Sequence, residues 1–431
     1  MELQKFEVPA LPREVWHLVL SHLPHRHLAR AILVCEDWAQ AAGDPHLWKD
    51  FSLRLASEES SGLGERLSRL LNLHRFSLLR KLELAHVAAG PVPLASTLSL
   101  STHHVHLIAS SSITSLRLDN CDLSECNEEA LAAMLNDLTD LDLEDVRWGA
   151  GQAHAVVSNM AQRTKLRSLK ISCPFSSQEE EGGVFLATMP PELLGSAFTK
   201  LEVLHLRMVV LSTSFWSTLF QLICVETCLK EVEFELQGVT SMSAKLFADA
   251  LSKIQSVDLS QVMVRPDQVS SLIDKVASGC AIRHLDLSSC DLSHINPPTL
   301  ARAVSSLKKV DVSNCGLNDR QVNSLFLALA TGSTTKDLDI GQTDLSSVPA
   351  EILAAGVNSL EKAVLPRLTS GQRDRLLDEV SRISNIAILS LKIKPSIFPI
   401  QASKNTTLQR LGIPDCQLEE VGTFFTQILK L

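Results

Sequence analysis

Five acidic side chains recur along the second half of the chain at intervals of 25 or 28 residues, each between two apolar residues. They are Glu233, Asp258, Asp286, Asp311 and Asp339. In a β-strand, the two residues that flank a position point to the face opposite to it. If the five residues lie on neighbouring strands, their carboxylates line one face about 4.8 Å apart. Because like charges side by side weaken a sheet, such a row suggests a surface that attracts a basic segment of a partner.

The sequence shows no set of residues typical of an active site. It contains no glycine-rich phosphate loop, no zinc-hydrolase helix and no serine elbow. Histidines crowd two short segments, which hold His22, His25 and His27, and His103, His104 and His106. No cysteine pair lies close to these histidines in sequence, so we interpret them as surface residues and not as zinc ligands. We therefore predict that the chain is not an enzyme and binds neither a metal nor a cofactor.

Composition excludes several classes of protein. The 431 residues carry a net charge of −9, which disfavours a general nucleic-acid binder. The ten cysteines are scattered and do not form the pattern of a small disulfide scaffold. The N-terminus lacks the basic start and apolar run of a signal peptide, and apolar patches such as 215–222 are too short to span a membrane. We expect a soluble protein of the cytosol or nucleus, without a membrane partner.

An internal repeat runs through most of the sequence. Apolar residues stand at positions 1, 4 and 6 of each copy, and often at 9 and 11, as in Ile282, Leu285, Leu287, Cys290 and Leu292. Positions 4 and 6 flank one residue, so both point to the same face of a short strand. The segments between strands, such as 128–138 and 320–330, have apolar residues at helical spacing. Since one strand and one helix cannot bury an apolar face alone, stacked units would build a continuous core.

About thirteen copies can be counted from the residue at position 4. These residues are Leu82, Leu116, Leu141, Leu169, Leu204, Val232, Val257, Leu285, Val310, Leu338, Ala363, Leu389 and Leu411. From Leu204 onward the steps mostly alternate between 28 and 25 residues. Two longer steps include the segments 90–112 and 176–183, which we predict to be loops, either solvated or on the binding face. The repeat predicts an α/β solenoid with a parallel sheet on the concave side and helices outside.

The pattern resembles the leucine-rich repeat. Four copies fit at all five positions; they begin at Ile113, Ile282, Leu307 and Leu408. The copies depart from the family at position 9, where Asn is never found and Cys stands at 121, 290, 315 and 416. A buried cysteine acts as a small apolar residue, so we interpret these four as core residues. In this repeat class an Asp between two apolar residues is common, so structure alone could explain most of the acidic row.

The first fifty residues follow a different pattern. Pro12 suits the first turn of a helix, and Glu14 complements the helix N-terminus. Apolar residues follow at 15, 16, 18, 19, 20 and 23, and Pro24 ends this helix. A second helical stretch is predicted over about 26–42. A third begins at Asp44-Pro45, with Trp48 as an aromatic anchor.

This segment resembles an F-box. The matching features are Leu11-Pro12 with Glu14, the apolar run through Leu20 and Leu23, Val34-Cys35 before Trp38, and Pro45-His46-Leu47-Trp48. An F-box followed by leucine-rich repeats is the layout of the F-box/leucine-rich-repeat family. The resemblance implies a three-helix F-box at 9–52, a linker or cap of the solenoid at 53–76 and a leucine-rich-repeat domain at 77–431.

The family resemblance also implies partners. Family F-boxes dock on the Skp adaptor of a cullin–RING ubiquitin ligase, the repeats hold a protein substrate, and other subunits transfer ubiquitin. The chain would then be a substrate-recognition subunit. Matched by motif, its adaptor-binding residues are Leu11, Pro12, Val15, Leu20, Leu23, Leu28, Val34 and Trp38. The five acidic residues form the candidate concave substrate surface.

The alternative is a repeat scaffold outside the ligases, of the ribonuclease-inhibitor or innate-immune type. The alternating spacing also fits those repeats. The N-terminal helices would then only cap the first repeat, because solenoids need capped ends. The two hypotheses differ in whether Leu11, Pro12 and Trp38 are exposed for a partner or buried against the first repeat.

Overall fold

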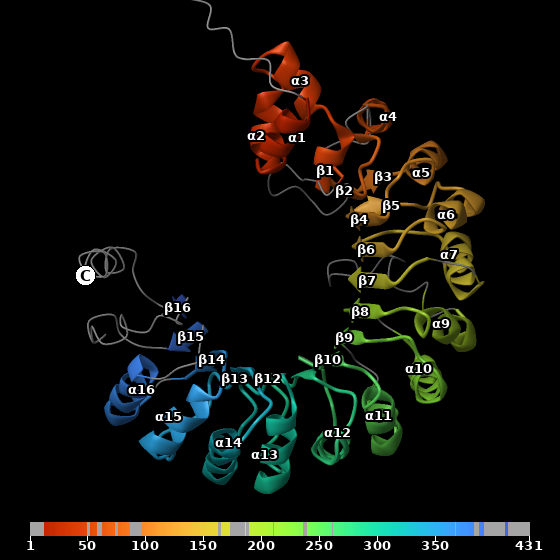
Figure 1. The fold of residues 1–431 in the computed structure, drawn as a ribbon. Coiled ribbons are helices and arrows are strands. Elements are labelled where there is room, and N and C mark those ends of the chain that lie inside the picture. Colours follow the sequence, from red (N-terminus) through yellow and green to blue (C-terminus); the bar gives the residue numbers. More distant parts are fainter. Residues whose placement is uncertain are drawn as a thin grey trace, which may run out of the picture. The chain divides into compact units, whose positions relative to one another are not determined.

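Two compact units make up the chain, Met1–Met189 and Pro190–Leu431. The computed structural model describes residues 13–49, 52–57, 63–73, 76–86, 97–162, 165–172, 186, 189–209, 211–235, 239–260, 262–366, 368–382, 388–391 and 410–412. Leu11, Pro12, the segment 176–183 and Cys416 lie outside these residues. In both units short strands alternate with helices along the chain (Figure 1).

The N-terminal unit contains a parallel sheet in which strands follow one another in chain order. Its strands are β1 (Ser52–Ser57), β2 (Lys81–His86), β4 (Ser115–Asp119), β6 (Asp140–Glu144) and β7 (Ser168–Ser172). A second sheet pairs β3 (Leu98–Ser99) with β5 (Cys121–Asp122). The helices are α1 (Arg13–Ser21), α2 (His25–Ala31), α3 (Glu36–Ala42), η1 (Pro45–Leu47), α4 (Leu63–Leu71), α5 (Thr102–Ala109), α6 (Glu128–Leu135) and α7 (Ala150–Gln162).

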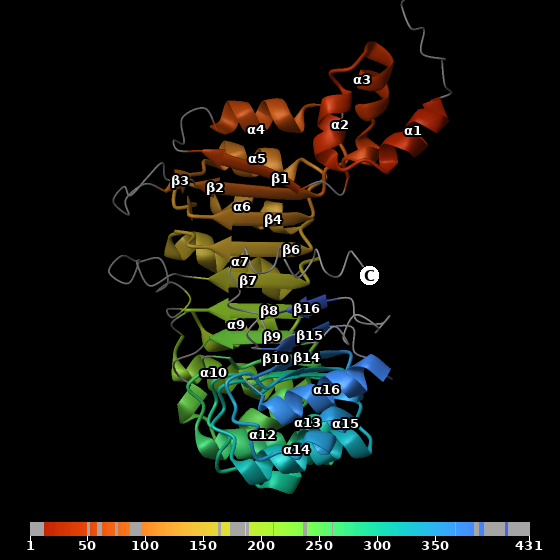
Figure 2. The same ribbon diagram turned by 90° about the vertical axis from the view of Figure 1, so that its left-hand side faces the viewer.

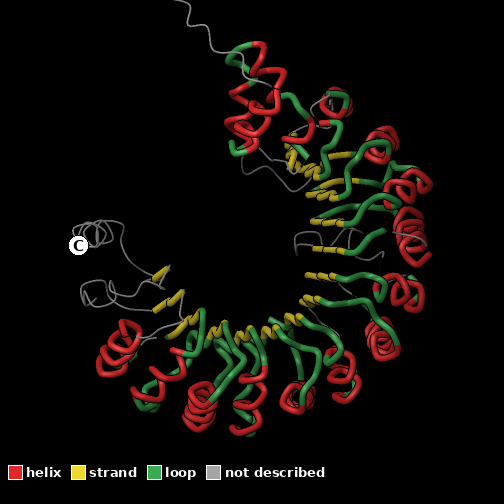
Figure 3. Tube along the Cα trace, viewed as in Figure 1, coloured by secondary structure: helices red, strands yellow, loops and turns green. Residues whose placement is uncertain are grey.

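The C-terminal unit has the same organisation. Its strands are β8 (Val203–Arg207), β9 (Glu231–Glu235), β10 (Ser256–Asp258), β11 (His284–Asp286), β12 (Lys309–Asp311), β13 (Asp337–Asp339), β14 (Lys362–Leu365), β15 (Ile388–Leu391) and β16 (Arg410–Gly412). The helices are α9 (Pro191–Phe198), α10 (Thr213–Val225), η4 (Val239–Ser241), α11 (Ala244–Leu251), α12 (Pro266–Ser278), α13 (Pro297–Ser306), α14 (Asp319–Thr331), α15 (Ala350–Asn358) and α16 (Ser370–Arg382). Within each unit the strands line one side and most helices cover the other (Figure 3).

The predicted repeat is confirmed by the strand register. Every one of the thirteen position-4 residues lies on a strand, and within each unit each is paired with the next, as Val257 is with Leu285 and Leu285 with Val310. The turned view shows the strands of the N-terminal unit side by side, pointing the same way (Figure 2). The register stacks apolar residues on apolar residues, which is the condition for a shared core.

Two segments of the N-terminal unit contain elements that the repeat pattern did not indicate. The segment 53–76, predicted as a linker or cap, contributes most of β1, whose Leu53 pairs with Leu82, and also α4. The long step over 90–112 was predicted to be a loop but contains the helix α5. Val105 and Ile108 of α5 are buried, so this segment supplies an ordinary outer helix of a repeat.

The alternation between 28 and 25 residues reflects two lengths of helix. In the C-terminal unit α10, α12, α14 and α16 each have 13 residues, whereas α9, α11, α13 and α15 have 8 to 10. Three of the longer helices carry a buried glutamine in the first turn, Gln268, Gln321 and Gln372. The Gln321 amide donates to the carbonyls of Leu292 and Ile295, at 2.6 and 2.8 Å. Gln268 and Gln372 make the equivalent bonds, so α12, α14 and α16 are each bonded to the turn that comes before the preceding helix.

We expect Gln321→Met to lower the free energy of unfolding by about 2 to 4 kcal/mol, because two buried carbonyls would lose their donor. Chemical denaturation followed by circular dichroism would measure the change. Arg320→Ala is the control, since Arg320 is exposed on the same helix, and it should change stability by less than about 0.5 kcal/mol. Equal effects of the two substitutions would contradict a structural role for the buried amide.

The N-terminal helical domain, residues 13–49, contains more breaks than predicted. The stretch 26–42 was predicted as one helical stretch but forms α2 and α3, separated by a turn at 32–34. The predicted third helix is the single 3-10 turn η1, capped by the Asp44 carboxylate, which accepts a hydrogen bond from the His46 amide. The number of turns differs, but the helical character of the domain is as predicted.

Trp48 joins this helical domain to the first repeat. Its indole is 3% exposed and donates to the carbonyl of Ala42, at 2.7 Å. The ring packs edge-on against Phe76, with centroids 5.5 Å apart. Phe76 and Leu79, just before β2, share one core cluster with Leu20 and Leu28. The domain therefore does cap the repeats, through one of its sides.

Candidate interaction surfaces

The helical domain exposes a group of large apolar side chains. Leu18 on α1 is 63% exposed, and Leu33 and Val34, in the turn after α2, are 84% and 61% exposed. Val15 and Val19 on α1 are also exposed. Among the described residues only four other large apolar side chains are exposed to this degree, and they are scattered over the rest of the chain. An exposed apolar group of this size on one small domain is typical of a protein interface.

The structure divides the predicted adaptor-binding residues into three groups. Val15 and Val34 are exposed. Leu23 and Trp38 are half-buried, and Trp38 packs on Trp16 with ring centroids 5.1 Å apart. Leu20 and Leu28 are buried in the core cluster, where they hold the helices together. Leu11 and Pro12 lie outside the described residues.

Leu18, Val19 and Leu33 are exposed apolar residues that the motif match did not select. The sequence did contain a signal for the first two. Apolar residues at 15, 16, 18, 19 and 20 cover more of a helix than the single stripe that a core needs. Leu33 gives no comparable signal, because its exposure depends on where α2 ends.

The five acidic residues form a row on neighbouring strands, as their spacing predicted. Glu233 pairs in register with Asp258, Asp258 with Asp286, Asp286 with Asp311, and Asp311 with Asp339. A shallow hollow of about 170 Å³ lies over the first four of them. The geometry of the row follows directly from the repeat.

Four carboxylates of the row make the same local hydrogen bond. Asp258, Asp286 and Asp311 each accept a hydrogen bond from the backbone amide two residues further on, at 2.8 to 2.9 Å. Asp339 accepts the equivalent bond from Gly341, at 2.9 Å. The bond holds the chain in the bend that follows each strand. The aspartates therefore have a structural role, which the leucine-rich-repeat resemblance also implied.

The other end of the row is an ion-pair cluster. Glu233 contacts His205 Nδ1 at 3.0 Å and Arg207 at 2.5 Å. His205 Nε2 lies 3.0 Å from Glu231. Glu233 is thus neutralised by neighbours on β8, so the acidic surface open to a partner is centred on the aspartates.

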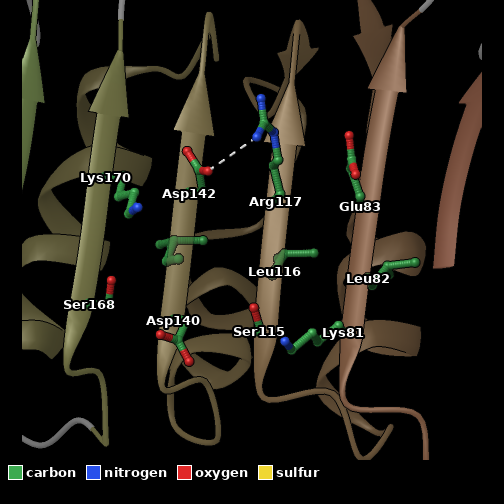
Figure 4. Close-up of a pocket in the computed structure, with 11 residues that line it drawn as sticks. Lys81, Leu82, Glu83, Ser115, Leu116, Arg117, Asp140, Asp142, Ser168 and Lys170 are labelled. Carbon is green, nitrogen blue, oxygen red and sulfur yellow. Dashed lines mark ion pairs between the residues drawn. The ribbon is translucent and has the colours of Figure 1, made fainter. Parts of the chain in front are cut away.

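The corresponding face of the N-terminal unit alternates in charge. Position 5 is occupied in turn by Glu83, Arg117, Asp142 and Lys170, around a hollow of about 330 Å³ (Figure 4). Arg117 points toward Asp142, with the charged groups 3.6 Å apart, and it also pairs with Glu144. Partial burial acts in the opposite direction, but the nearby carboxylates raise the pKa of Arg117. Alternating signs neutralise one another here, unlike the aspartates of the C-terminal unit.

The described position-9 cysteines are buried core residues. The thiols of Cys121, Cys290 and Cys315 face carbonyls of the preceding repeat, at 3.0 to 3.8 Å; these belong to Leu84 on β2 and to Leu259 and Leu287, each directly after a strand. Burial raises the pKa of each of the three to about 12. Thiols in this state are protonated and unreactive. Within the described residues no group of three or more His, Cys, Asp or Glu side chains could hold a metal ion.

Two family models match the chain at the positions where the structure shows these features. A model described as F-box-like matches residues 8–54, and one described as Leucine Rich Repeat matches residues 281–303. The chain thus carries an F-box-like domain followed by leucine-rich repeats, as the sequence resemblance implied. The second match covers β11 and the start of α13, one strand–helix unit of the solenoid.

Among solved structures, the fold is similar to one described as the crystal structure of the Rad7 and Elc1 complex in yeast. The two chains are 14% identical, the match covers 93% of this chain and 92% of the other, and the TM-score is 0.44. No curated protein matches the sequence. No helix in the described part of the chain has the length and apolar content needed to cross a membrane.

We expect Asp286→Asn to stabilise the protein at pH 7 by less than about 1 kcal/mol. Burial, and then the charges of Asp311 and Asp258, raise the pKa of Asp286 above its ordinary value of 3.8. The charged form is therefore unfavourable in the fold, while Asn keeps an oxygen for the Ser288 amide. As the pH falls toward 3.8, folded wild-type protein takes up the proton first, so the advantage of Asn should disappear.

Thermal unfolding of both proteins between about pH 7 and pH 3.5 would measure this dependence. Asp291→Asn is the matched control in the same repeat. Hydrogen bonds from Ser293 lower the pKa of Asp291, so loss of its charge should give no stabilisation at pH 7. A pH-independent effect of Asp286→Asn would show that the acidic row costs no stability.

Proposed function

We propose that this chain is the substrate-recognition subunit of a Skp–cullin–F-box ubiquitin ligase. Its F-box-like domain binds the Skp adaptor, which links it to the cullin core, and its leucine-rich repeats bind a protein substrate. The chain itself catalyses nothing, because ubiquitin is transferred by other subunits. Such complexes work in the cytoplasm or the nucleus.

The exposed apolar group on the helical domain carries this proposal. A domain that only capped the first repeat would need one apolar side, and Trp48 and the core cluster already supply it. Leu18, Leu33 and Val34 lie outside that contact and meet water. They supplement the motif-matched residues, of which Val15, Val34 and Trp38 would contact the adaptor. Leu20 and Leu28 would support the same surface from behind.

The concave faces of the repeats are the proposed substrate surface. The candidate row on these faces consists of Glu233, Asp258, Asp286, Asp311 and Asp339. Its four aspartates lie on adjacent strands in register, with no basic residue between them in the row. Surfaces kept for binding commonly cost some stability. The aspartates also hold the bend after each strand, so the row would have a structural role as well as a role in substrate binding.

We expect Leu18→Glu with Val34→Asp to abolish the stable complex with the Skp adaptor, because both place a charge in an apolar interface. The chain would be co-expressed with the adaptor and the complex analysed by size-exclusion chromatography. Val225→Asp with Leu327→Glu is the matched control, since these residues are also more than half exposed but lie on α10 and α14. The control complex should remain intact.

Circular dichroism would show that both double variants keep folded repeats, since all four residues are exposed. No complex with the intact chain would reject the ligase proposal and favour the scaffold of ribonuclease-inhibitor or innate-immune type. A complex that survives Leu18→Glu with Val34→Asp would move the adaptor surface elsewhere on the chain.

A further inference from the structure

Cations gather at the N-terminal ends of three successive strands in the C-terminal unit. Arg283 precedes β11, Lys308 precedes β12, Lys309 is the first residue of β12, and Lys336 precedes β13; all four are exposed. We name these four residues the cationic edge. The chain as a whole has a net charge of −9, whereas this run over three adjoining repeats is positive.

Most of the cationic edge has no acidic partner within the described residues. Lys308 and Lys309 form no ion pair there, and the Arg283 guanidinium donates to the carbonyls of Cys280 and Ile282, at 2.8 Å. Lys336 lies 3.6 Å from Glu361 in an exposed pair, which is a weak interaction. The positive charge is therefore available to a ligand.

The backbone fixes the spacing of the cationic edge. The Lys308 amide donates to the Arg283 carbonyl at 2.7 Å, and the Lys336 amide donates to the Lys308 carbonyl at 2.8 Å. The three residues consequently repeat at the strand separation of about 4.8 Å.

The acidic row limits what can lie beside the cationic edge. Asp286 and Asp311 stand two residues further along the same strands as His284 and Lys309, and all four line one hollow. A ligand that was acidic on all sides would be repelled by these aspartates. The surface therefore fits a partner with carboxylates along one line and neutral or basic residues along the next.

An α-helix that crosses the strands meets this spacing better than an extended segment does. Residues spaced alternately by three and four on a helix lie on one face, which advances about 5.4 Å per turn. Same-side residues of an extended segment are about 6.8 Å apart. Across three strands the mismatch grows to about 1 Å for the helix and about 4 Å for the extended segment.

We infer that the cationic edge binds an amphipathic acidic helix of a partner protein, with a line of glutamates or aspartates over Arg283, Lys308, Lys309 and Lys336. This inference deepens the proposed function, because it states the chemistry of the segment that the repeats recognise in a substrate. Binding at this edge requires no adaptor, so it can be tested apart from the F-box.

The probe is a fluorescein-labelled helical peptide of about 16 residues, with glutamates spaced by three and four on an alanine and glutamine background. Its twin carries glutamine in place of each glutamate. Fluorescence anisotropy with the full chain, at about 50 mM salt, would give both affinities. We expect the glutamate peptide to bind at least about tenfold more tightly than its twin.

Lys308→Glu with Lys309→Glu should weaken binding of the glutamate peptide at least about tenfold. The matched control is Arg302→Glu with Arg320→Glu, which makes the same change in net charge in the same repeats, on exposed positions of α13 and α14. That control should stay within about twofold of the wild type. Lys308→Gln with Lys309→Gln, a milder change, should weaken binding in the same direction.

Failure of the glutamate peptide to bind, equal binding of its twin, or equal loss in the two double variants would overturn the inference. The adaptor complex provides the separate readout. If the double variant at 308 and 309 still forms that complex while the intact chain ignores the peptide, the ligase proposal stands and the acidic-helix inference falls. If the peptide binds as expected but no adaptor complex forms, the acidic helix belongs to a partner outside the ligases.

Discussion

One constraint determines this structure: a single strand and helix cannot bury their apolar face, so every repeat must stack in register on the next. Leu285 lies between Val257 and Val310, and the same alignment runs through both units. A slip of one residue would turn the apolar side chains to solvent and the charged ones into the core. The register that builds the core therefore also aligns position 5, and charged rows follow from it.

The same stacking accounts for the unusual polar residues inside the solenoid. Turns between strand and helix leave carbonyls in the core, and a buried carbonyl without a donor is costly. Gln268, Gln321 and Gln372 supply amide donors from α12, α14 and α16, and the position-9 thiols face carbonyls of the preceding repeat. These side chains join neighbouring repeats while remaining unreactive.

The helical domain has apolar side chains in two different surroundings. Trp48 and its neighbours pack toward Phe76 and the first repeat, whereas Leu18, Leu33 and Val34 meet solvent. From the sequence, the N-terminal helices could either cap the first repeat or bind a partner. The geometry allows one domain to do both. On the repeats, charge rather than apolar area distinguishes the surfaces: the N-terminal unit alternates in sign, and the C-terminal unit separates an acidic row from a cationic edge.

The sequence by itself determined the repeat, the strand positions and the acidic row. Pairs of apolar residues two positions apart, and a nearly constant repeat length, can be read directly from the sequence. Because repeats of this kind stack in parallel, these patterns also predict the sheet. It did not determine β1, whose Leu53 has no full repeat around it, or the break between α2 and α3. Nor could it separate the buried Leu20 and Leu28 from the exposed Leu18 and Leu33. All four are leucines in apolar stretches, and only the packing of one helix against another decides which side chain meets water.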